Sequence, residues 1–211
     1  MALWDFVKSI ASDLVEQAEK DVERKRRKVE RKARTTPEYQ PGKKGNKVAI
    51  VVSAPGRAEE KAGHPLAGQC RKPVERLLKK AHERDPKKFP SDDLNDLRVI
   101  NITPEPHYKK KTGDTEGRDR DNLSPENLKR VGGKLRGMEM IIPLGNKPQK
   151  VVKKVIEKAK SNQEVLPGRH PSAQSLNRGC KSNKKTASER AEHRMDQFAD
   201  DVLGKKGRKK K

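Results

Sequence analysis

The run Val48-Ala-Ile-Val-Val52, followed by Ser53-Ala-Pro-Gly56, is the strongest indication of the fold class in this sequence. Five consecutive apolar residues, four of them β-branched, are typical of a strand that is buried on both faces. The Pro-Gly pair then predicts a turn at the carboxyl end of this strand. A strand of this kind belongs to a mostly parallel sheet, so we expect other strands beside it and helices on both of its faces.

The rest of the chain, from Lys47 to about Leu203, alternates strand and helix patterns in the manner of a βαβ fold. Apolar runs predict three further strands at 97–102, 138–142 and 164–166. Amphipathic patterns predict helices at 71–84, from about 125, at 147–160 and at about 184–203. We therefore predict an α/β fold with three layers, α/β/α, around a short, mostly parallel four-stranded sheet. Ligands of such sheets bind at the carboxyl ends of the strands.

Residues 3–34 predict one long helix, an N-terminal helical arm. Its apolar residues recur every three or four positions: Leu3, Phe6, Val7, Ile10, Leu14, Val15, Ala18 and Val22. A run of Arg and Lys follows them. Either this helix packs on the core, or its apolar half binds a partner protein or a second copy. Residues 35–46, rich in Pro and Gly, predict a linker. The expected segments are an arm at 1–40, an α/β domain at 41–203 and a basic tail at 204–211.

The formal net charge of +22 over 211 residues indicates a polyanionic partner, most commonly nucleic acid. A basic surface that serves only solubility is the alternative. No run approaches the roughly 18 apolar residues of a membrane-spanning helix, so we expect no membrane contact. Cys70 and Cys180 lack the spacing of a metal site, and the chain shows no signal-peptide pattern. We therefore expect no metal, no cofactor and a cytoplasmic, nucleoid-associated protein.

Three polar segments follow predicted strands, and each suits the handling of a nucleotide. Ser53–Gly56 with Gly63-His-Pro-Leu-Ala-Gly68 is glycine-rich, which lets backbone N–H groups approach a ligand closely. Asn101 ends a strand, and its amide offers both a donor and an acceptor for the edge of a base. In the loop 168–179, His170 precedes a rigid proline and can donate to a leaving group. Each of the first two segments taken alone also fits an ordinary turn.

Taken in this order, the segments resemble the uracil-DNA glycosylase superfamily. Ser53–Gly56 with Gly63–Gly68 is similar to the first motif of its thermophilic branch, GEAPG followed by GxPFxG. His170-Pro-Ser-Ala-Gln-Ser175 is similar to the HPSPLS minor-groove loop of the main branch, and Met140–Gly145 is similar to a late strand of these domains. The resemblance covers roughly residues 47–180.

The resemblance implies a DNA glycosylase that acts on double-stranded DNA. His170 would stabilise the departing base, and Asn101 would read the flipped base. The substrate pocket would be lined by Ser53, Ala54, Pro55, Gly56, His64 and Leu66. The DNA would be bound by Arg169, Ser172, Gln174, Ser175 and Arg178. His107 would contact DNA or substrate only if its long basic loop reaches the site.

The sequence also departs from the family pattern. Ser53 and Ala54 stand where the first motif has an Asp, Asn or Glu that positions water. Leu66 replaces the aromatic residue that stacks on uracil, and Gln174 replaces the wedge Leu. The cluster cysteines of the thermophilic branch are missing, so the resemblance implies no iron–sulfur cluster. Two functions stay open: excision of a deaminated or otherwise modified pyrimidine, in repair or in defence against modified viral DNA, and a catalytically silent DNA-binding module.

Overall fold

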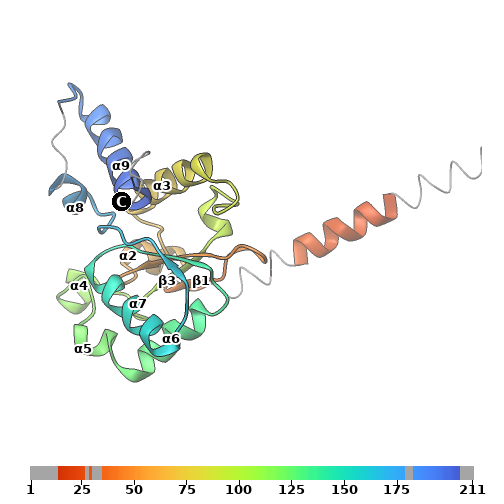
Figure 1. Cartoon of the computed structure of the whole chain (residues 1–211), viewed down its shortest axis with the longest axis horizontal. Coiled ribbons are helices and arrows are strands. Elements are labelled where there is room, and N and C mark those ends of the chain that lie inside the picture. Colours follow the sequence, from red (N-terminus) through yellow and green to blue (C-terminus); the bar gives the residue numbers. More distant parts are fainter. Residues whose placement is uncertain (1–13, 27–28, 30–34, 179–182, 205–211) are drawn as a thin grey trace, which may run out of the picture. The chain divides into compact units, whose positions relative to one another are not determined.

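The computed structural model describes residues 14–26, 29, 35–178 and 183–204. The chain divides into two compact units, Met1–Arg34 and Thr35–Lys211 (Figure 1). The first part of the expected N-terminal helix and the expected basic tail from residue 205 lie outside the described residues, as does Cys180.

The second unit is built on a sheet whose described strands lie in the order β1-β3-β2-β4-β5. These strands are β1 (Tyr39–Gln40), β2 (Val48–Val52), β3 (Arg98–Asn101), β4 (Met140–Pro143) and β5 (Glu164–Val165). The central strand β2 is parallel to β3 and β4, and β5 is parallel to β4. Every residue of β2 is buried, as expected for a strand covered on both faces.

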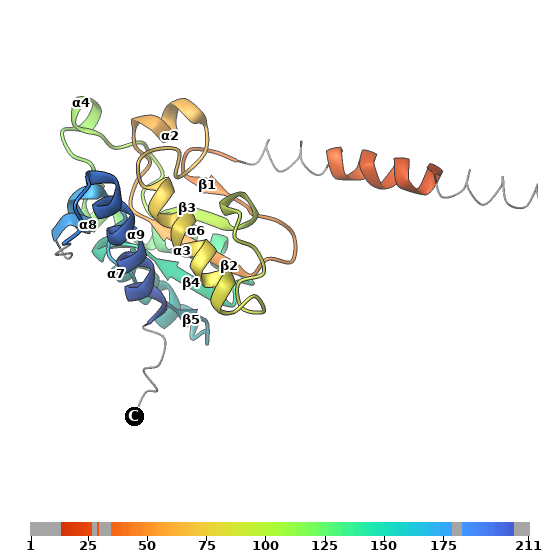
Figure 2. The ribbon, with the colours of Figure 1, turned by 90° about the horizontal axis from the view of Figure 1, so that it is seen from above.

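Helices cover both faces of this sheet (Figure 2). They are α2 (Arg57–Ala62), α3 (Arg71–Arg84), α4 (Lys109–Thr112), α5 (Asp119–Asn122), α6 (Pro125–Leu135), α7 (Asn146–Ala159), α8 (Ala173–Arg178) and α9 (Ala187–Leu203), with a 3-10 turn η1 at Leu94–Asp96. The predicted helices at 71–84, 147–160 and 184–203 thus correspond to α3, α7 and α9 within three residues at each end.

The alternation of side chains along β2 divides the core into two clusters, because successive strand residues point to opposite faces. Val48, Ile50 and Val52 pack with apolar residues of α3 and α9. Ala49 and Val51 pack with apolar residues of α6 and α7 on the other face. This is the three-layer α/β/α arrangement, and the predicted fold class is confirmed.

The sheet has one strand more than the four predicted. Strand β1 lies in the expected linker and pairs antiparallel with β3. It is too short to produce an apolar alternation, and polar side chains hold it instead. Gln40 is 7% exposed, and its Nε2 donates to the carbonyl groups of Leu94 at 2.8 Å and Leu97 at 3.0 Å. The boundary between the two units therefore falls after Arg34, six residues before the expected end of the arm.

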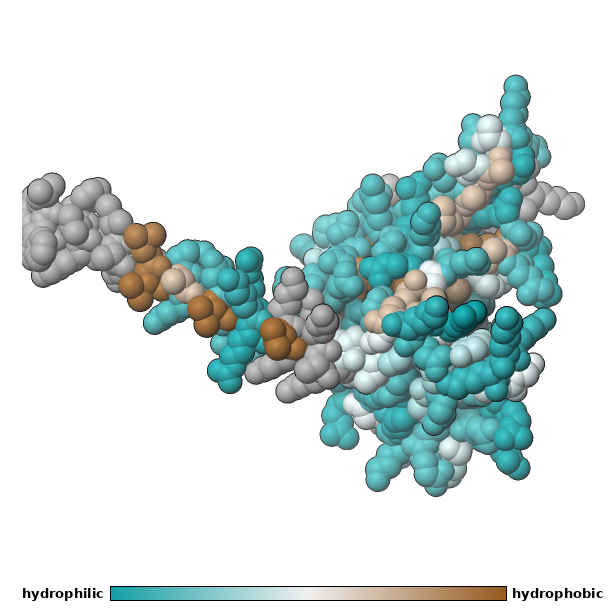
Figure 3. Space-filling model, turned by 180° about the vertical axis from the view of Figure 1, so that it is seen from behind, coloured by the Kyte–Doolittle hydropathy of each residue, from teal (hydrophilic) through white to brown (hydrophobic). Residues whose placement is uncertain are grey.

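Within the first unit, residues 14–26 form a helix. Three of the apolar side chains predicted to form a stripe on it are largely exposed, from 58% to 66%: Leu14, Val15 and Val22. Hydrophobic residues stand out on this helix in Figure 3, whereas the second unit is mostly hydrophilic on the face in view. Among the residues that the structure describes, no helix is long and apolar enough to cross a membrane.

Candidate active site

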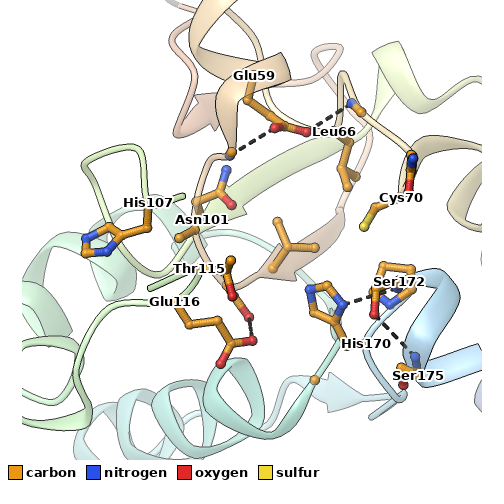
Figure 4. A pocket seen from close by; sticks show the side chains of 18 of the residues that line it. Glu59, Leu66, Cys70, Asn101, His107, Thr115, Glu116, His170, Ser172 and Ser175 are labelled. Atoms are coloured by element: carbon orange, nitrogen blue, oxygen red, sulfur yellow. Dashed lines mark hydrogen bonds between the residues drawn. The ribbon is translucent and has the colours of Figure 1, made fainter. Parts of the chain in front are cut away.

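The carboxyl ends of β2, β3 and β4 and the loop after β5 meet at one pocket of about 720 Å³ (Figure 4). Its walls come from the exit of β2, from residues 66–70, from the segment between β3 and α5, and from residues 145–147 and 169–178. A polar pocket at this edge of a parallel sheet is the expected place for a ligand.

All predicted site residues except Pro55 and His64 line this pocket. Those that line it are Ser53, Ala54, Gly56, Leu66, Asn101, Arg169, His170, Ser172, Gln174, Ser175 and Arg178. Pro55 is buried, and its carbonyl accepts a hydrogen bond from the backbone N–H of His107 at 2.8 Å. The His64 ring lies with Nδ1 3.0 Å from the carbonyl oxygen of Pro65, within its own loop. Neither Pro55 nor His64 is therefore among the residues that line this pocket.

The two halves of the first motif are joined by Glu59, which was not among the predicted site residues. One carboxylate oxygen accepts the N–H of Gly56 at 2.9 Å, and the other accepts the N–H of Gly68 at 3.0 Å. Glycine at both positions leaves room for this carboxylate, because a Cβ would lie 3.0 Å and 3.3 Å, respectively, from these same oxygens. The negative charge of Glu59 thus fixes the pocket wall through both of its oxygens.

Leu66 occupies the place on this wall where the family pattern has an aromatic residue. Its side chain is 4% exposed and packs into the core cluster beneath α3. Its backbone has a φ of +52°, in the left-handed region that favours glycine. This backbone conformation of leucine is unfavourable by on the order of 1–3 kcal/mol. Strained backbone of this kind is common in ligand-binding sites.

His170 presents an N–H group to the pocket. Its Nδ1 accepts a hydrogen bond from the backbone N–H of Ser172 at 3.2 Å, so the proton of the neutral ring is on Nε2. Figure 4 shows this second nitrogen on the side of the ring away from Ser172. Burial lowers the pKa of His170, and the negative charge of Glu116 raises that pKa by a smaller amount. A neutral imidazole that donates through Nε2 therefore faces the pocket at neutral pH.

Asn101 lines the pocket and also supports the sheet. It is 1% exposed, and its Nδ2 donates to the carbonyl of Pro37 at 3.1 Å. Its backbone N–H donates to the carbonyl of Glu38 at 2.8 Å. One amide proton of Asn101 is thus used to hold the segment before β1, and its role toward a base stays a prediction.

The loop predicted to bind DNA is organised around Ser172. The Oγ of Ser172 accepts the backbone N–H of Ser175 at 3.4 Å at the start of α8. The guanidinium of Arg169 forms an ion pair with Asp201 of α9, so this cation holds the loop to the helix. Gln174 and Arg178 are exposed at the pocket, where they are accessible to a phosphate backbone.

Glu116 also enters the pocket, from the loop between α4 and α5 (Figure 4). The Ser53 hydroxyl donates to its Oε1 at 3.2 Å, and the Nζ of Lys147 lies 3.6 Å from its Oε2. Gly117 lets this loop approach the segment after β3 closely, because a Cβ there would lie 2.8 Å from the Oγ1 of Thr103. The signal in the sequence was a pair of acids between two glycines, Gly113-Asp-Thr-Glu-Gly117, in a segment with Lys and Arg on both sides.

The segment before this loop, from His107 into α4, also borders the pocket and forms polar pairs. The Nδ1 of His107 lies 2.7 Å from the Oδ1 of Asp114, and this hydrogen bond lowers the pKa of Asp114. The Tyr108 hydroxyl donates to Glu60 at 2.8 Å, and the Lys111 ammonium lies 2.5 Å from the other oxygen of Glu60. These contacts tie α4 to α2, and His107 itself lines the pocket.

Residues 40–192 match the family model of the Uracil DNA glycosylase superfamily. The match covers well over half of the chain, so the chain belongs to this superfamily. It begins at Gln40 in β1 and ends in α9, in agreement with the extent of the α/β unit. Proteins of this superfamily are generally DNA glycosylases, hydrolases that act on DNA in base excision. None of the curated proteins matches the chain.

Proposed function

We propose that the protein is a monofunctional DNA glycosylase that flips an altered pyrimidine out of double-stranded DNA and hydrolyses its C1′–N bond. The observation that carries this proposal is the neutral His170 ring, with Nε2–H as the donor in the pocket. The base leaves with the electron pair of the broken bond, and a donor fixed at that place stabilises the negative charge. The family of the chain supports the class of reaction.

The size and wall of the pocket support a substituted base as the substrate. A volume of about 720 Å³ lies within the range of roughly 300–1,000 Å³ that holds drug-sized ligands. Leu66 provides an apolar wall without the aromatic ring that would limit the room for a substituent on the base. The base is therefore a deaminated or otherwise modified pyrimidine. Two biological roles fit this chemistry, DNA repair and defence against modified viral DNA.

The charge of the chain supports DNA as the partner and the nucleoid as the place of action. The net charge is +22, and the exposed cations Arg57 and Arg178 line the pocket. Cations at the mouth of a pocket bind the phosphates on either side of a flipped nucleotide, which positions the base without reading the sequence.

The proposal is tested by single-turnover excision. Duplexes that carry uracil, a 5-hydroxymethylated pyrimidine or a 5-glycosylated pyrimidine are incubated with the protein and then treated with alkali, which breaks the strand at each abasic site. We expect cleavage of at least one modified duplex. His170→Ala should lower that rate by roughly a hundred- to a thousand-fold, the usual effect of removing such a donor.

The matched control is His193→Ala on α9, because this histidine does not line the pocket. Its excision rate should equal that of the wild type, and all three proteins should bind undamaged duplex equally. DNA binding without excision of any modified base would instead support a catalytically silent module. A His170→Ala rate within about threefold of wild type would remove His170 from the mechanism.

A further inference from the structure

We infer that Glu116 is a catalytic residue, whose carboxylate holds and deprotonates the water that attacks C1′. This inference rests on the proposed function and adds the group that completes its site. Hydrolysis of a glycosidic bond needs a nucleophile as well as stabilisation of the leaving base. His170 serves the base, and the exit of β2 offers no carboxylate because Ser53 and Ala54 stand there.

Glu116 is the acid of the pocket whose carboxylate is available to hold the attacking water. The acidic residues among the described residues that line the pocket are Glu59 and Glu116. Both oxygens of Glu59 accept backbone N–H groups of the pocket wall, at 2.9 Å and 3.0 Å. The Glu116 side chain is 37% exposed, so it has room to accept a hydrogen bond from water.

The surroundings of Glu116 fix where its carboxylate lies. Ser53, the first residue after β2, donates its hydroxyl to Oε1, which brings the carboxylate to the carboxyl end of the central strand. Lys147, near the start of α7, lies beside Oε2 and also donates to the carbonyl of Gly117 at 2.7 Å. Ser53 and Lys147 are therefore positioning residues for Glu116.

Glu116 and His170 face the same space from two different loops (Figure 4). Burial lowers the pKa of the His170 imidazole, and the negative charge of Glu116 raises that pKa by a smaller amount, so the two groups interact electrostatically. The sugar that forms as the bond breaks resembles an oxocarbenium ion, which a carboxylate stabilises on one side while the imidazole stabilises the base on the other.

The reaction balances with water as the only co-reactant. The C1′–N bond breaks, and its electron pair leaves with the base, whose negative charge accepts the hydrogen bond from Nε2–H of His170. The water oxygen forms a bond to C1′, and its proton passes to the Glu116 carboxylate. That proton then goes to the departed base, which restores the carboxylate and leaves a neutral base and an abasic sugar.

The test uses the full chain with Glu116→Gln, Glu116→Ala and the control Glu105→Gln, a charge-matched change at an exposed residue outside the pocket. Glu116→Gln keeps an oxygen for the Ser53 hydroxyl but cannot take a proton. Its single-turnover excision rate should fall by about a hundred-fold or more, the usual contribution of a general base. The control should excise as the wild type does.

Two further readouts separate catalysis from structure. The melting temperature and the affinity for a duplex with an abasic site should not change in Glu116→Gln, and added formate should restore part of the activity of Glu116→Ala. The inference is overturned if Glu116→Gln excises within about threefold of wild type, or if its loss is matched by an equal loss of abasic-duplex affinity. In either case wild-type excision leaves the proposed function standing. A wild type that excises no base overturns both proposals.

Discussion

Burial of the His170 ring couples its protonation to folding. The folded pKa lies below the ordinary value of 6.5, so the unfolded chain binds the proton more readily as the pH falls below that value. The stability that depends on a neutral His170 is present above about pH 6.5 and is lost as the pH falls toward the lowered pKa. Protonation of Nδ1 also opposes the N–H donor of Ser172.

We therefore expect the melting temperature of the wild type to fall more steeply than that of His170→Asn between about pH 7 and pH 5. The comparison removes the contribution of the other titrating groups, because both proteins share them. Calorimetry at several pH values measures the difference, and parallel curves for the two proteins would contradict the burial of a neutral imidazole.

Leu66 is the residue that should set the size of the accepted base. Leu66→Phe places an aromatic ring on the pocket wall and narrows the space for a substituent. The ratio of excision rates for a 5-glycosylated pyrimidine over uracil should fall by about tenfold or more, since contacts of this size are worth roughly 1–3 kcal/mol in discrimination.

The control for this change is Leu66→Met, which conserves the side-chain volume and should leave the ratio near that of the wild type. Both variants are compared by single-turnover excision on the two duplexes. A ratio that is the same in Leu66→Phe and Leu66→Met would place the determinant of size elsewhere in the pocket.

At the scale of elements, β1 belongs to the α/β unit although it lies in a segment that resembles a linker. Glu38 pairs with Arg130 and Lys134 of α6, and Gln40 donates to two buried carbonyl groups. Removal of residues 1–34 should therefore leave the melting temperature of the unit unchanged, whereas removal of residues 1–40 should lower it.

The size of this loss follows from the two hydrogen bonds that Gln40 donates to the carbonyl groups of Leu94 and Leu97, which are worth about 0.5–1.5 kcal/mol each. For a unit of this length, each kcal/mol shifts the melting temperature by about 2–4 °C, so we expect a decrease of at least about 2 °C. Differential scanning calorimetry of the two truncations decides the point, and equal melting temperatures would show that β1 adds no stability.

In the molecule as a whole, part of the positive charge behind the net value of +22 is paired with carboxylates, so fewer cationic side chains are free to bind the phosphates of DNA. Cations of α3 are paired with carboxylates of α9, as in the Arg76–Asp196 pair at 2.6 Å and the Lys80–Asp200 pair at 3.3 Å. These cations contribute to the attachment of α9 rather than to phosphate contacts. The slope of DNA affinity against salt concentration should therefore reflect only the cations that contact phosphates, and not the full net charge.

We expect the affinity for random duplex to fall by orders of magnitude between about 50 and 200 mM salt, as counterions are released from several phosphates. Arg178→Gln should lower the slope of log K against log salt by about 1, because Arg178 is exposed at the pocket, whereas Arg76→Gln should leave the slope unchanged. Fluorescence anisotropy over a salt series measures both, and a flat dependence would contradict the electrostatic interpretation.

The fold class, the main strands and helices, and the three loops that meet at the pocket could all be predicted from the amino-acid sequence. These features follow from local sequence patterns: the apolar run of β2, the amphipathic periodicity of α3 and α7, and the turn residues that follow each strand. The rule that parallel strands place their carboxyl ends at one edge then brings the loops of Ser53, Asn101 and His170 together.

The hydrogen-bond partner of each polar side chain at this edge, in contrast, follows from the three-dimensional arrangement of the loops. Asn101 bonds to Pro37, Arg169 pairs with Asp201, and Glu116 reaches Ser53 from a loop more than sixty residues away. Such contacts join residues that are distant in the sequence, and loops have no periodicity from which their direction follows. The packed core sets the orientation of those loops. A buried polar group then forms a hydrogen bond with the donor or acceptor that lies within reach, and the local sequence does not specify that partner.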